Sequence, residues 1–158
     1  MSRLFFPPAN VLRSVYRPVC FPLFSARHAS KLAPVLTANA PQPVGPYSQA
    51  ISARGVLYLS GQIPLTSSGI PVQSADIRDH TRQVLDNLSS VLQAGGSSLE
   101  RVVKVNVFVT DIKQFGAVNE VYAEYFKTNT PARSLVEVSA LPLGVPLEIE
   151  AVALVEEK

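Results

Sequence analysis

The stretch from Val102 to Thr110, VVKVNVFVT, decides how the rest of the chain can be arranged. β-Branched residues fit a pleated surface, so its composition favours a strand. Side chains of a strand alternate between two faces, so we expect an apolar face interrupted on its reverse side by Lys104 and Asn106. The expected apolar face consists of Val103, Val105, Val107 and Val109.

A helix is expected on the N-terminal side of this strand, from about Ser74 to Ala94. Ser74 can cap it, acidic residues suit its positive end, and the pair Gly95-Gly96 ends it. Apolar residues recur at helical spacing and predict one buried stripe. The stripe consists of Ile77, Val84, Leu85, Leu88, Val91 and Leu92.

A second helix is expected on the C-terminal side and ends near Phe126. Asp111 and Gln114 form a candidate capping box at its start. Its apolar stripe is interrupted by Asn119, and a buried amide needs hydrogen-bond partners, so Asn119 either bonds to local backbone or points into a site. The stripe consists of Phe115, Val118, Tyr122 and Phe126.

Two strands precede the first helix, at 47–53 and 56–60, and two end the chain, at 133–139 and 147–155. The proline-rich stretch 34–46 predicts a loop. The order β-β-α-β-α-β-β predicts an α+β domain with one mixed sheet and two helices on one face. Two helices cannot cover both faces, so we expect oligomerisation through the open face.

Residues 1–30 have the composition of a mitochondrial transit peptide. The chain has no acidic residue before Asp76, whereas five basic residues lie within the first 31. No apolar run there is long enough for a secretory signal or a membrane span, although a basic disordered arm is an alternative. We therefore predict a mature domain at 31–158 in the mitochondrial matrix, with no membrane partner.

The predicted domain is acidic, because nine basic residues face 12 acidic ones from residue 32 onward. A phosphate backbone has little electrostatic reason to bind it, so no nucleic-acid partner is expected. The only cysteine, Cys20, and one of the two histidines, His28, lie in the leader. His80 is expected to be an exposed surface residue. A thiol nucleophile is therefore excluded, and a metal site is not expected.

Arg133 and Glu148 are the candidate catalytic residues, each at the start of a predicted strand. The planar guanidinium of an arginine can hold a carboxylate through two hydrogen bonds. Glu148 begins an otherwise apolar strand, where desolvation would raise its pKa and suit it to proton transfer near neutral pH. Taken alone, each residue is more simply read as a solvated strand end.

A simple hairpin of the last two strands would keep Arg133 and Glu148 roughly 20 Å apart, at ~3.3 Å per residue. A shared site therefore requires that these strands are not neighbours, or that the two residues meet across a subunit boundary. The connector 141–146 is longer and richer in proline than a tight turn, which permits the first arrangement.

Five segments resemble the Rid family of reactive intermediate deaminases, and they follow one another in the family's order. They are 45–50 (GPYSQA), 60–64 (SGQIP), 119–122 (NEVY), 131–134 (PARS) and 148–150 (EIE). The likeness runs from about residue 32 to the C-terminus. With its leader, the chain resembles fungal mitochondrial members of the family.

The resemblance implies a chorismate-mutase-like fold and a homotrimer with sites between subunits. It implies hydrolysis of 2-imino and enamino acids, such as 2-iminobutanoate and 2-iminopropanoate, to 2-oxo acids and ammonia, without metal or cofactor. Arg133 matches the arginine that holds the substrate carboxylate, and Glu148 matches the glutamate that orients or activates water. Tyr47, Gly61 and Asn119 match further substrate contacts. Protection of pyridoxal-phosphate enzymes, isoleucine synthesis and mitochondrial genome maintenance are roles implied at the level of the family.

One position departs from the family's pattern. Many members have a cysteine two residues after the arginine, where this chain has Leu135. The family's substrate contact there is made largely by main chain, so hydrolysis is expected to survive. Activities that depend on the thiol are not expected, and the larger leucine predicts a narrower or more apolar pocket.

Two other functions are compatible with these motifs. A regulatory trimer that binds 2-oxo acids without turnover would use the same arginine, but it would gain nothing from the negative charge of Glu148. A ribonuclease or translation inhibitor is claimed for some relatives. The acidic domain and the lack of a usable histidine pair argue against it here.

Overall fold

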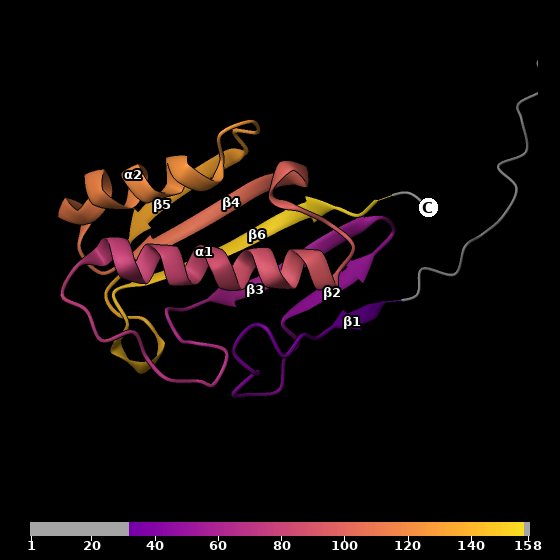
Figure 1. Ribbon diagram of the computed structural model, residues 1–158, viewed down its shortest axis with the longest axis horizontal. Helices are drawn as coiled ribbons and strands as arrows, with labels where there is room; N and C mark the ends of the chain where they lie inside the picture. The colour runs from indigo at the N-terminus through magenta and orange to yellow at the C-terminus, as the bar shows by residue number, and fades with distance from the viewer. Residues whose placement is uncertain (1–31, 157–158) are drawn as a thin grey trace, which may run out of the picture.

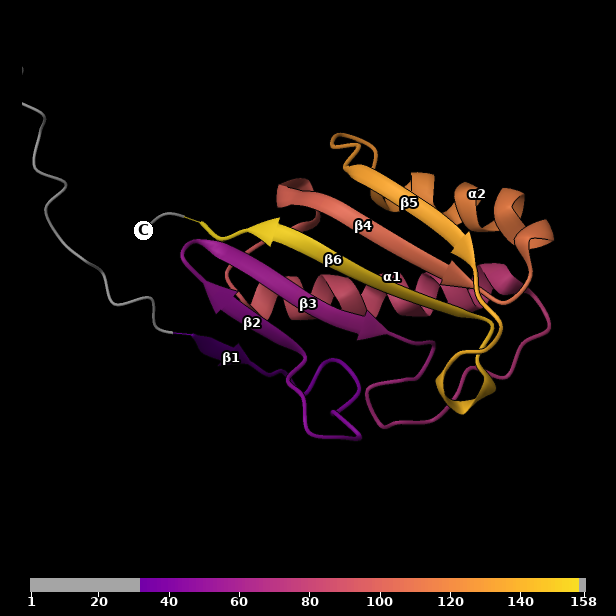
Figure 2. The ribbon, with the colours of Figure 1, turned by 180° about the vertical axis from the view of Figure 1, so that it is seen from behind.

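The structure is a computed structural model that describes residues 32–156. The predicted transit peptide at 1–30 lies outside the described residues. One six-stranded mixed sheet carries two α-helices on one of its faces (Figure 1), and the view from behind shows the other face bare of helices (Figure 2). The predicted α+β class, with one mixed sheet and two helices on one face, is confirmed.

The last strand of the chain lies in the middle of the sheet, because the strand order is β1-β2-β3-β6-β4-β5. β4 and β5 are parallel, and the other neighbouring pairs are antiparallel. The helix α1 (Ile77–Ala94) connects β3 to β4, and α2 (Phe115–Tyr125) connects β4 to β5. The strands are β1 (Ala33–Val35), β2 (Ala50–Ala53), β3 (Val56–Gln62), β4 (Val102–Val109), β5 (Ala132–Glu137) and β6 (Leu147–Leu154).

The valine-rich stretch forms β4, and Val105, Val107 and Val109 lie fully buried beneath the helices. Val103 is 43% exposed, so its predicted place on this apolar face is wrong. The pairing of β4 with β6 shifts register between Val102 and Lys104, and Val102 is the residue that turns into the core. An extra residue in one strand of a pair reverses the alternation beyond it, which a strict two-residue period cannot predict.

The apolar stripe predicted for α1 is confirmed, since all six of its residues are buried. The N-cap is Asp76 rather than Ser74: Asp76 accepts a hydrogen bond from the backbone of Arg78 at 2.9 Å. The Ser74 hydroxyl instead donates to the Asp79 carboxylate at 2.7 Å. Gly95 ends the helix, as expected.

The start of α2 differs from the expected capping box. Asp111 accepts from the backbone of Lys113 and caps a 3₁₀ turn at Ile112–Gln114, after which α2 begins at Phe115. Phe115 is 46% exposed, while the other three residues of the predicted stripe are buried. The helix ends at Tyr125, with Phe126 as its C-cap, as predicted.

The first strand, β1, was not expected, because it contains Pro34 within a proline-rich stretch. It lies at the edge of the sheet, where a residue without an N–H is tolerated. β2 begins at Ala50 rather than residue 47, and the segment before it is a loop. Arg54 and Gly55 connect β2 to β3 with positive φ angles of 51° and 77°, which is a tight hairpin turn.

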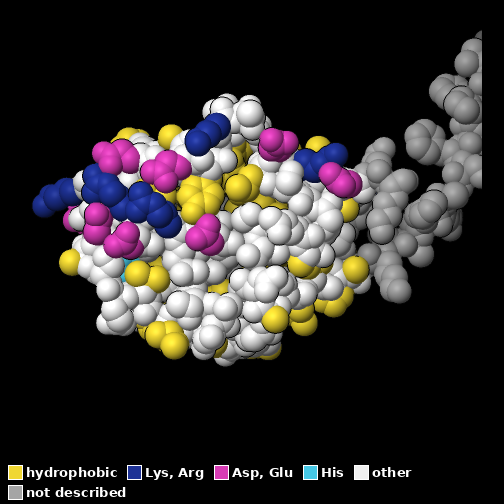
Figure 3. Space-filling model, in the orientation of Figure 1, with side chains coloured by type: hydrophobic (Ala, Val, Ile, Leu, Met, Phe, Trp, Pro, Cys, Tyr) yellow, Lys and Arg dark blue, Asp and Glu magenta, His cyan; other side chains and the backbone are white. Residues whose placement is uncertain are grey.

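Many of the charged side chains lie on the helix-covered side of the molecule, with apolar side chains on the same side (Figure 3). In Figure 3, dark blue and magenta side chains gather over α1 and α2. The opposite sheet face instead exposes Tyr58, Val136 and Leu154, each at about half of its full accessible surface. No helix in the described part of the chain is long and apolar enough to cross a membrane.

Candidate active site

A pocket of about 350 Å³ at the N-terminal end of β6 brings together three of the six predicted site residues, Tyr47, Gly61 and Glu148. β3 supplies Gly61, β6 supplies Glu148, and the loop before β2 supplies Tyr47. Ser60 and Leu143 also line the pocket. The Rid-like segments 45–50, 60–64 and 148–150 therefore converge, although about 100 residues of chain separate the first from the last.

Glu148 lies directly over Gly61. A Cβ atom added to Gly61 would collide with the Glu148 carboxyl group, so glycine at this position makes room for the acid. Burial raises the pKa of the Glu148 carboxyl, and the negative charge of Glu150 on the same strand raises it further. A carboxylate with this pKa accepts a proton more readily near neutral pH than an exposed glutamate does.

Glu150 is held in place on the open face by Asn106 of β4, whose amide donates to its carboxylate at 2.7 Å. The sequence predicts that Asn106 interrupts one face of its strand, but gives no sign that it contacts this acid. Asn106 thereby fixes the second negative charge two residues from Glu148, on the same face of β6.

The loop that carries Tyr47 is organised by Gln49, which is 2% exposed. Its amide nitrogen donates to the carbonyls of Thr37, Ala40 and Pro41, and its oxygen accepts from the Thr37 backbone. The Tyr47 hydroxyl accepts from the Val44 backbone at 3.3 Å. Sequence reasoning missed Gln49 as a separate residue, although it falls inside the segment 45–50.

Arg133 occupies a different environment. It lies on β5 opposite Val105 of β4, and its guanidinium carbon lies 4.5 Å from the centre of the Tyr122 ring on α2. No carboxylate within residues 32–156 forms an ion pair with Arg133. Its charge is therefore held by an aromatic face and is not neutralised by an acid.

Leu135 and Asn119 lie on the same side of the sheet as Arg133. Leu135 pairs with Val107 and packs partly buried against the core. Asn119 is half-buried on α2, three residues before Tyr122. Arg133, Leu135 and Asn119 do not line the pocket that contains Glu148.

Within one chain, Arg133 and Glu148 lie on opposite faces of the sheet. Arg133 is opposite Val105 and Glu148 is opposite Phe108, three residues further along β4. An odd spacing places two residues on different faces. Two strand spacings and three residues also separate their Cα atoms by about 14 Å in the plane of the sheet. β5 and β6 are not neighbours, so the simple hairpin is excluded, but this alone does not unite the two residues.

His80 differs from its predicted exposed position. It is half-buried at the start of α1, and its Nε2 lies 2.8 Å from the Ser74 carbonyl oxygen, which can only accept a hydrogen bond, so Nε2 is the donor. Its Nδ1 is buried with no hydrogen-bond partner in the described structure. Within residues 32–156, no three potential metal ligands come together. The expectation that the reaction needs no metal stays a prediction.

The profile of the family described as Endoribonuclease L-PSP matches residues 37–155. The chain belongs to this family. A crystal structure from Yersinia pestis, of the protein YyfA described as a member of the conserved Rid protein family, superposes on this L-PSP domain with a TM-score of 0.77. That structure is 48% identical, and the match covers 79% of this chain and 100% of the other. The Rid resemblance drawn from the five segments is confirmed.

Two curated relatives of this L-PSP family domain have names that state an activity or a location. The 2-iminobutanoate/2-iminopropanoate deaminase of Homo sapiens is 43% identical over 120 residues, which are 76% of this chain and 88% of the human protein. The mitochondrial protein MMF1 of Saccharomyces cerevisiae is 46% identical over 127 residues, which are 80% of this chain and 87% of the yeast protein.

Proposed function

We propose that this protein hydrolyses 2-imino acids, such as 2-iminobutanoate and 2-iminopropanoate, to 2-oxo acids and ammonia. The observation that carries the proposal is that one chain contains two groups of complementary chemistry. One is an arginine whose charge no described acid neutralises, and the other is a glutamate whose pKa is raised. The name of the human relative supports the choice of reaction.

Arg133 would bind the carboxylate of the substrate through the edge of its guanidinium. Glu148 would take a proton from a water molecule as the water oxygen bonds to the imine carbon, and would pass this proton to the imine nitrogen. In the resulting carbinolamine the hydroxyl proton would move to the amine nitrogen in the same way, the C–N bond breaks, ammonia leaves and the 2-oxo acid remains. Orientation of the reactants and proton transfer supply the acceleration, and proton transfer alone contributes roughly 10²–10⁴-fold.

The site would form between two subunits of a homotrimer. One subunit supplies Arg133, Leu135 and Asn119, and its neighbour supplies Tyr47, Gly61 and Glu148. The opposite-face placement of Arg133 and Glu148 supports this division, because no single chain of this fold can bring them together. The open sheet face, with Tyr58, Val136 and Leu154 exposed, is the surface that we assign to the contact between subunits.

We place the protein in the mitochondrial matrix, with residues 1–30 as a transit peptide. The basic, acid-free composition of the leader supports this location, as does the name of the yeast relative MMF1. In the matrix the enzyme would remove reactive imines released by pyridoxal-phosphate dehydratases, which would protect such enzymes and support isoleucine synthesis. A role in mitochondrial genome maintenance would follow indirectly, since no nucleic-acid partner is expected.

A coupled assay tests the proposal. A threonine or serine dehydratase generates 2-aminocrotonate or 2-aminoacrylate, and the formation of 2-oxo acid is followed with and without the full chain. We expect the 2-oxo acid to appear faster when the wild-type protein is present. We expect this acceleration to be lost in Arg133→Ala. A rate equal to that in buffer alone would reject the enzyme. Binding of 2-oxobutanoate in a calorimeter without turnover would instead support the regulatory trimer.

The family's description as an endoribonuclease makes RNA cleavage the competing activity to measure. His80 is the only histidine after residue 31, and it is held at the start of α1 by the Ser74 carbonyl. A pair of acid–base histidines is therefore absent from residues 32–156. Cleavage of single-stranded RNA that is abolished by Glu148→Gln would favour the ribonuclease over the deaminase.

A further inference from the structure

We propose that Tyr122 is a positioning residue for Arg133, which acts by presenting its ring as a rigid aromatic platform beneath the guanidinium. The inference rests on the proposed function and names a specificity element of the same site. Tyr122 lies in the segment 119–122, but the sequence places it only in the apolar stripe of α2, and nothing there links it to Arg133.

The contact has the geometry of a cation–π interaction, with 4.5 Å between the guanidinium carbon and the centre of the ring. A guanidinium that stacks on an aromatic face keeps its N–H groups available around its edge. A carboxylate in the place of Tyr122 would occupy those N–H groups and cancel the charge. The aromatic partner therefore fixes Arg133 while leaving both its charge and its donors for a substrate carboxylate.

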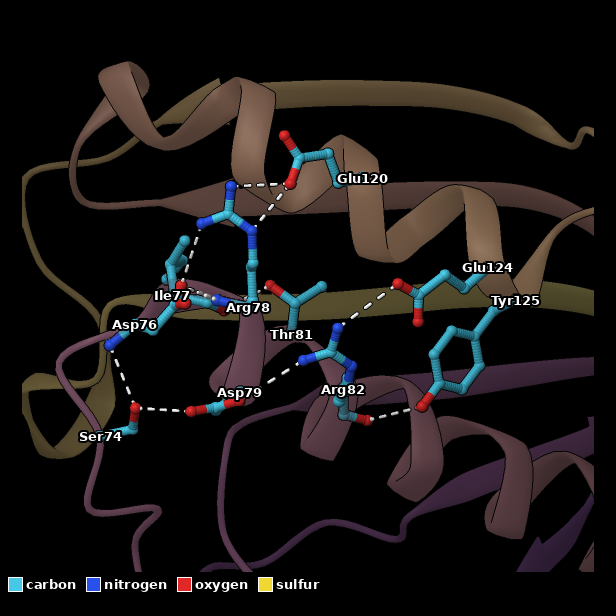
Figure 4. A network of polar contacts seen from close by, with 10 residues as sticks. All are labelled: Ser74, Asp76, Ile77, Arg78, Asp79, Thr81, Arg82, Glu120, Glu124 and Tyr125. Carbon is cyan, nitrogen blue, oxygen red and sulfur yellow. Dashed lines mark hydrogen bonds and ion pairs between the residues drawn. The ribbon is translucent and has the colours of Figure 1, made fainter.

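The Tyr122 ring is itself buried and stacked on a second aromatic ring. It is 9% exposed and stacks on Phe126, with 4.4 Å between ring centres and 26° between ring planes. α2 is also tied to α1 by polar contacts (Figure 4). Figure 4 shows Arg78 paired with Glu120, at 2.7 Å. Tyr125 also donates to Asp86 of α1 at 2.8 Å, a contact that the figure does not draw. The platform is thus part of the helical layer, and Arg133 on β5 lies against it.

The ring of Tyr122 carries the role, and its hydroxyl does not. The hydroxyl is buried and has no hydrogen-bond partner in the described structure. Burial raises the pKa of Tyr122 to about 12, against the opposing charge of Arg133. The phenol therefore stays neutral at physiological pH and adds no anion that would compete with the substrate carboxylate for Arg133.

The test compares two substitutions in the full chain. Tyr122→Phe keeps the platform, and we expect its KM for 2-iminobutanoate within about twofold of wild type. Tyr122→Leu removes the platform, and we expect KM to rise about 2–30-fold, with kcat changed much less. Val118→Ala is the matched control, because Val118 is a fully buried residue of α2 and its truncation keeps the aromatic ring of Tyr122 in the chain. It should lower the melting temperature without raising KM.

A second measurement needs no turnover. The ring current of Tyr122 should shift the NMR signals of the Arg133 side chain upfield in wild type and in Tyr122→Phe, with assignment by Arg133→Lys. The shift should vanish in Tyr122→Leu. If the wild type hydrolyses no imine, the proposed function fails while the platform can still be observed. An unchanged KM and an unchanged shift in Tyr122→Leu would overturn the platform, as would an equal rise of KM in Val118→Ala.

Discussion

Arg133 and Glu148 lie on opposite faces of the sheet, and their surroundings act on their charges in opposite ways. On the helix-covered face, Arg133 rests on an aromatic ring and keeps its charge free of any described acid. On the open face, Glu148 is partly buried close to another carboxylate, that of Glu150, and its charged form is disfavoured. A cation that must bind an anion benefits from a neutral partner, which leaves its charge available. A base that must accept a proton benefits from burial beside another negative charge, which raises its pKa. One chain thus contains both Arg133 and Glu148 in suitable environments, but it cannot bring the two residues together.

The largest effect is expected from mixing two inactive variants. Arg133→Ala should lose substrate binding, and Glu148→Gln should lose about 10²–10⁴-fold in kcat because proton transfer is removed. When the two variants are co-expressed, some sites receive an intact Arg133 from one chain and an intact Glu148 from another. Random assembly of a closed oligomer should then restore about a quarter of the wild-type sites.

Activity of the mixed preparation and its mass by light scattering check this prediction together. A mixture of Arg133→Ala with the double variant Arg133→Ala/Glu148→Gln is the control, because no site in it has an intact arginine. A mixture as inactive as this control, in an oligomer shown to contain both variants, would place the whole site within one chain.

A single methyl group added at Gly61 should disable Glu148 on the open face and leave Arg133 on the helix-covered face unaffected. In Gly61→Ala the new Cβ collides with the Glu148 carboxyl group, and the flexible side chain can move away. We therefore expect a folded protein whose kcat falls at least about tenfold while its affinity for 2-oxobutanoate, set by Arg133, is nearly kept. Gly116→Ala is the control, because a Cβ there meets no atom within 4 Å. Wild-type kcat in Gly61→Ala would show that Glu148 need not lie where the structure places it.

Much of the fold could be predicted because local periodicity determines it. The buried stripe of α1 and the strand around Val107 follow from spacing alone, and the two helices on one sheet face follow from the order of the elements. The errors lie where one hydrogen bond or one extra residue decides. Asp76 competes with Ser74 for the same cap, and the register shift at Val102 exposes Val103. No local pattern distinguishes these alternatives.

The candidate site was less predictable than the fold. The motifs name Arg133 and Glu148, but their opposite faces depend on β6 inserting between β3 and β4, which is a long-range pairing. The residues that contact Arg133 or hold the acid beside Glu148 are harder still to infer from the sequence. Tyr122 looks like a core aromatic and Asn106 like a polar interruption, because their partners are distant in sequence.

A smaller effect is expected in the pH dependence of kcat/KM, which Glu148 on the open face should determine on the acid side. The raised pKa of Glu148 should make kcat/KM fall on the acid side at a higher pH than an ordinary glutamate would, and Glu150→Gln should move this inflection to lower pH by removing the neighbouring charge. Glu156→Gln is the control, since Glu156 faces Arg101 instead. An inflection that stays in place in Glu150→Gln would mean that burial alone sets the pKa of Glu148.

The same carboxyl should affect stability with a definite sign. A raised pKa means that folded Glu148 binds its proton more tightly than the unfolded chain does. The free energy of unfolding therefore decreases as the pH rises from the unfolded value near 4.5 through the folded value. Glu148→Gln should thus raise the melting temperature at pH 7 more than at pH 4, as measured by calorimetry. An equal change at both pH values would contradict the desolvation of this acid.

The smallest effect is expected from two tyrosines of α2, where stability and substrate binding should separate. The Tyr125 hydroxyl donates to Asp86 at 2.8 Å, whereas that of Tyr122 has no partner in the described structure. Tyr125→Phe should lower the free energy of unfolding by about 0.5–1.5 kcal/mol and leave KM unchanged, because the lost hydrogen bond joins α2 to Asp86 of α1 and does not involve Arg133. Tyr122→Phe loses no such bond and should be at least as stable as wild type in urea unfolding. If Tyr122→Phe were the less stable of the two, its hydroxyl would have a partner in the assembled protein, and the helix-covered face would then contribute to the contact between subunits as well.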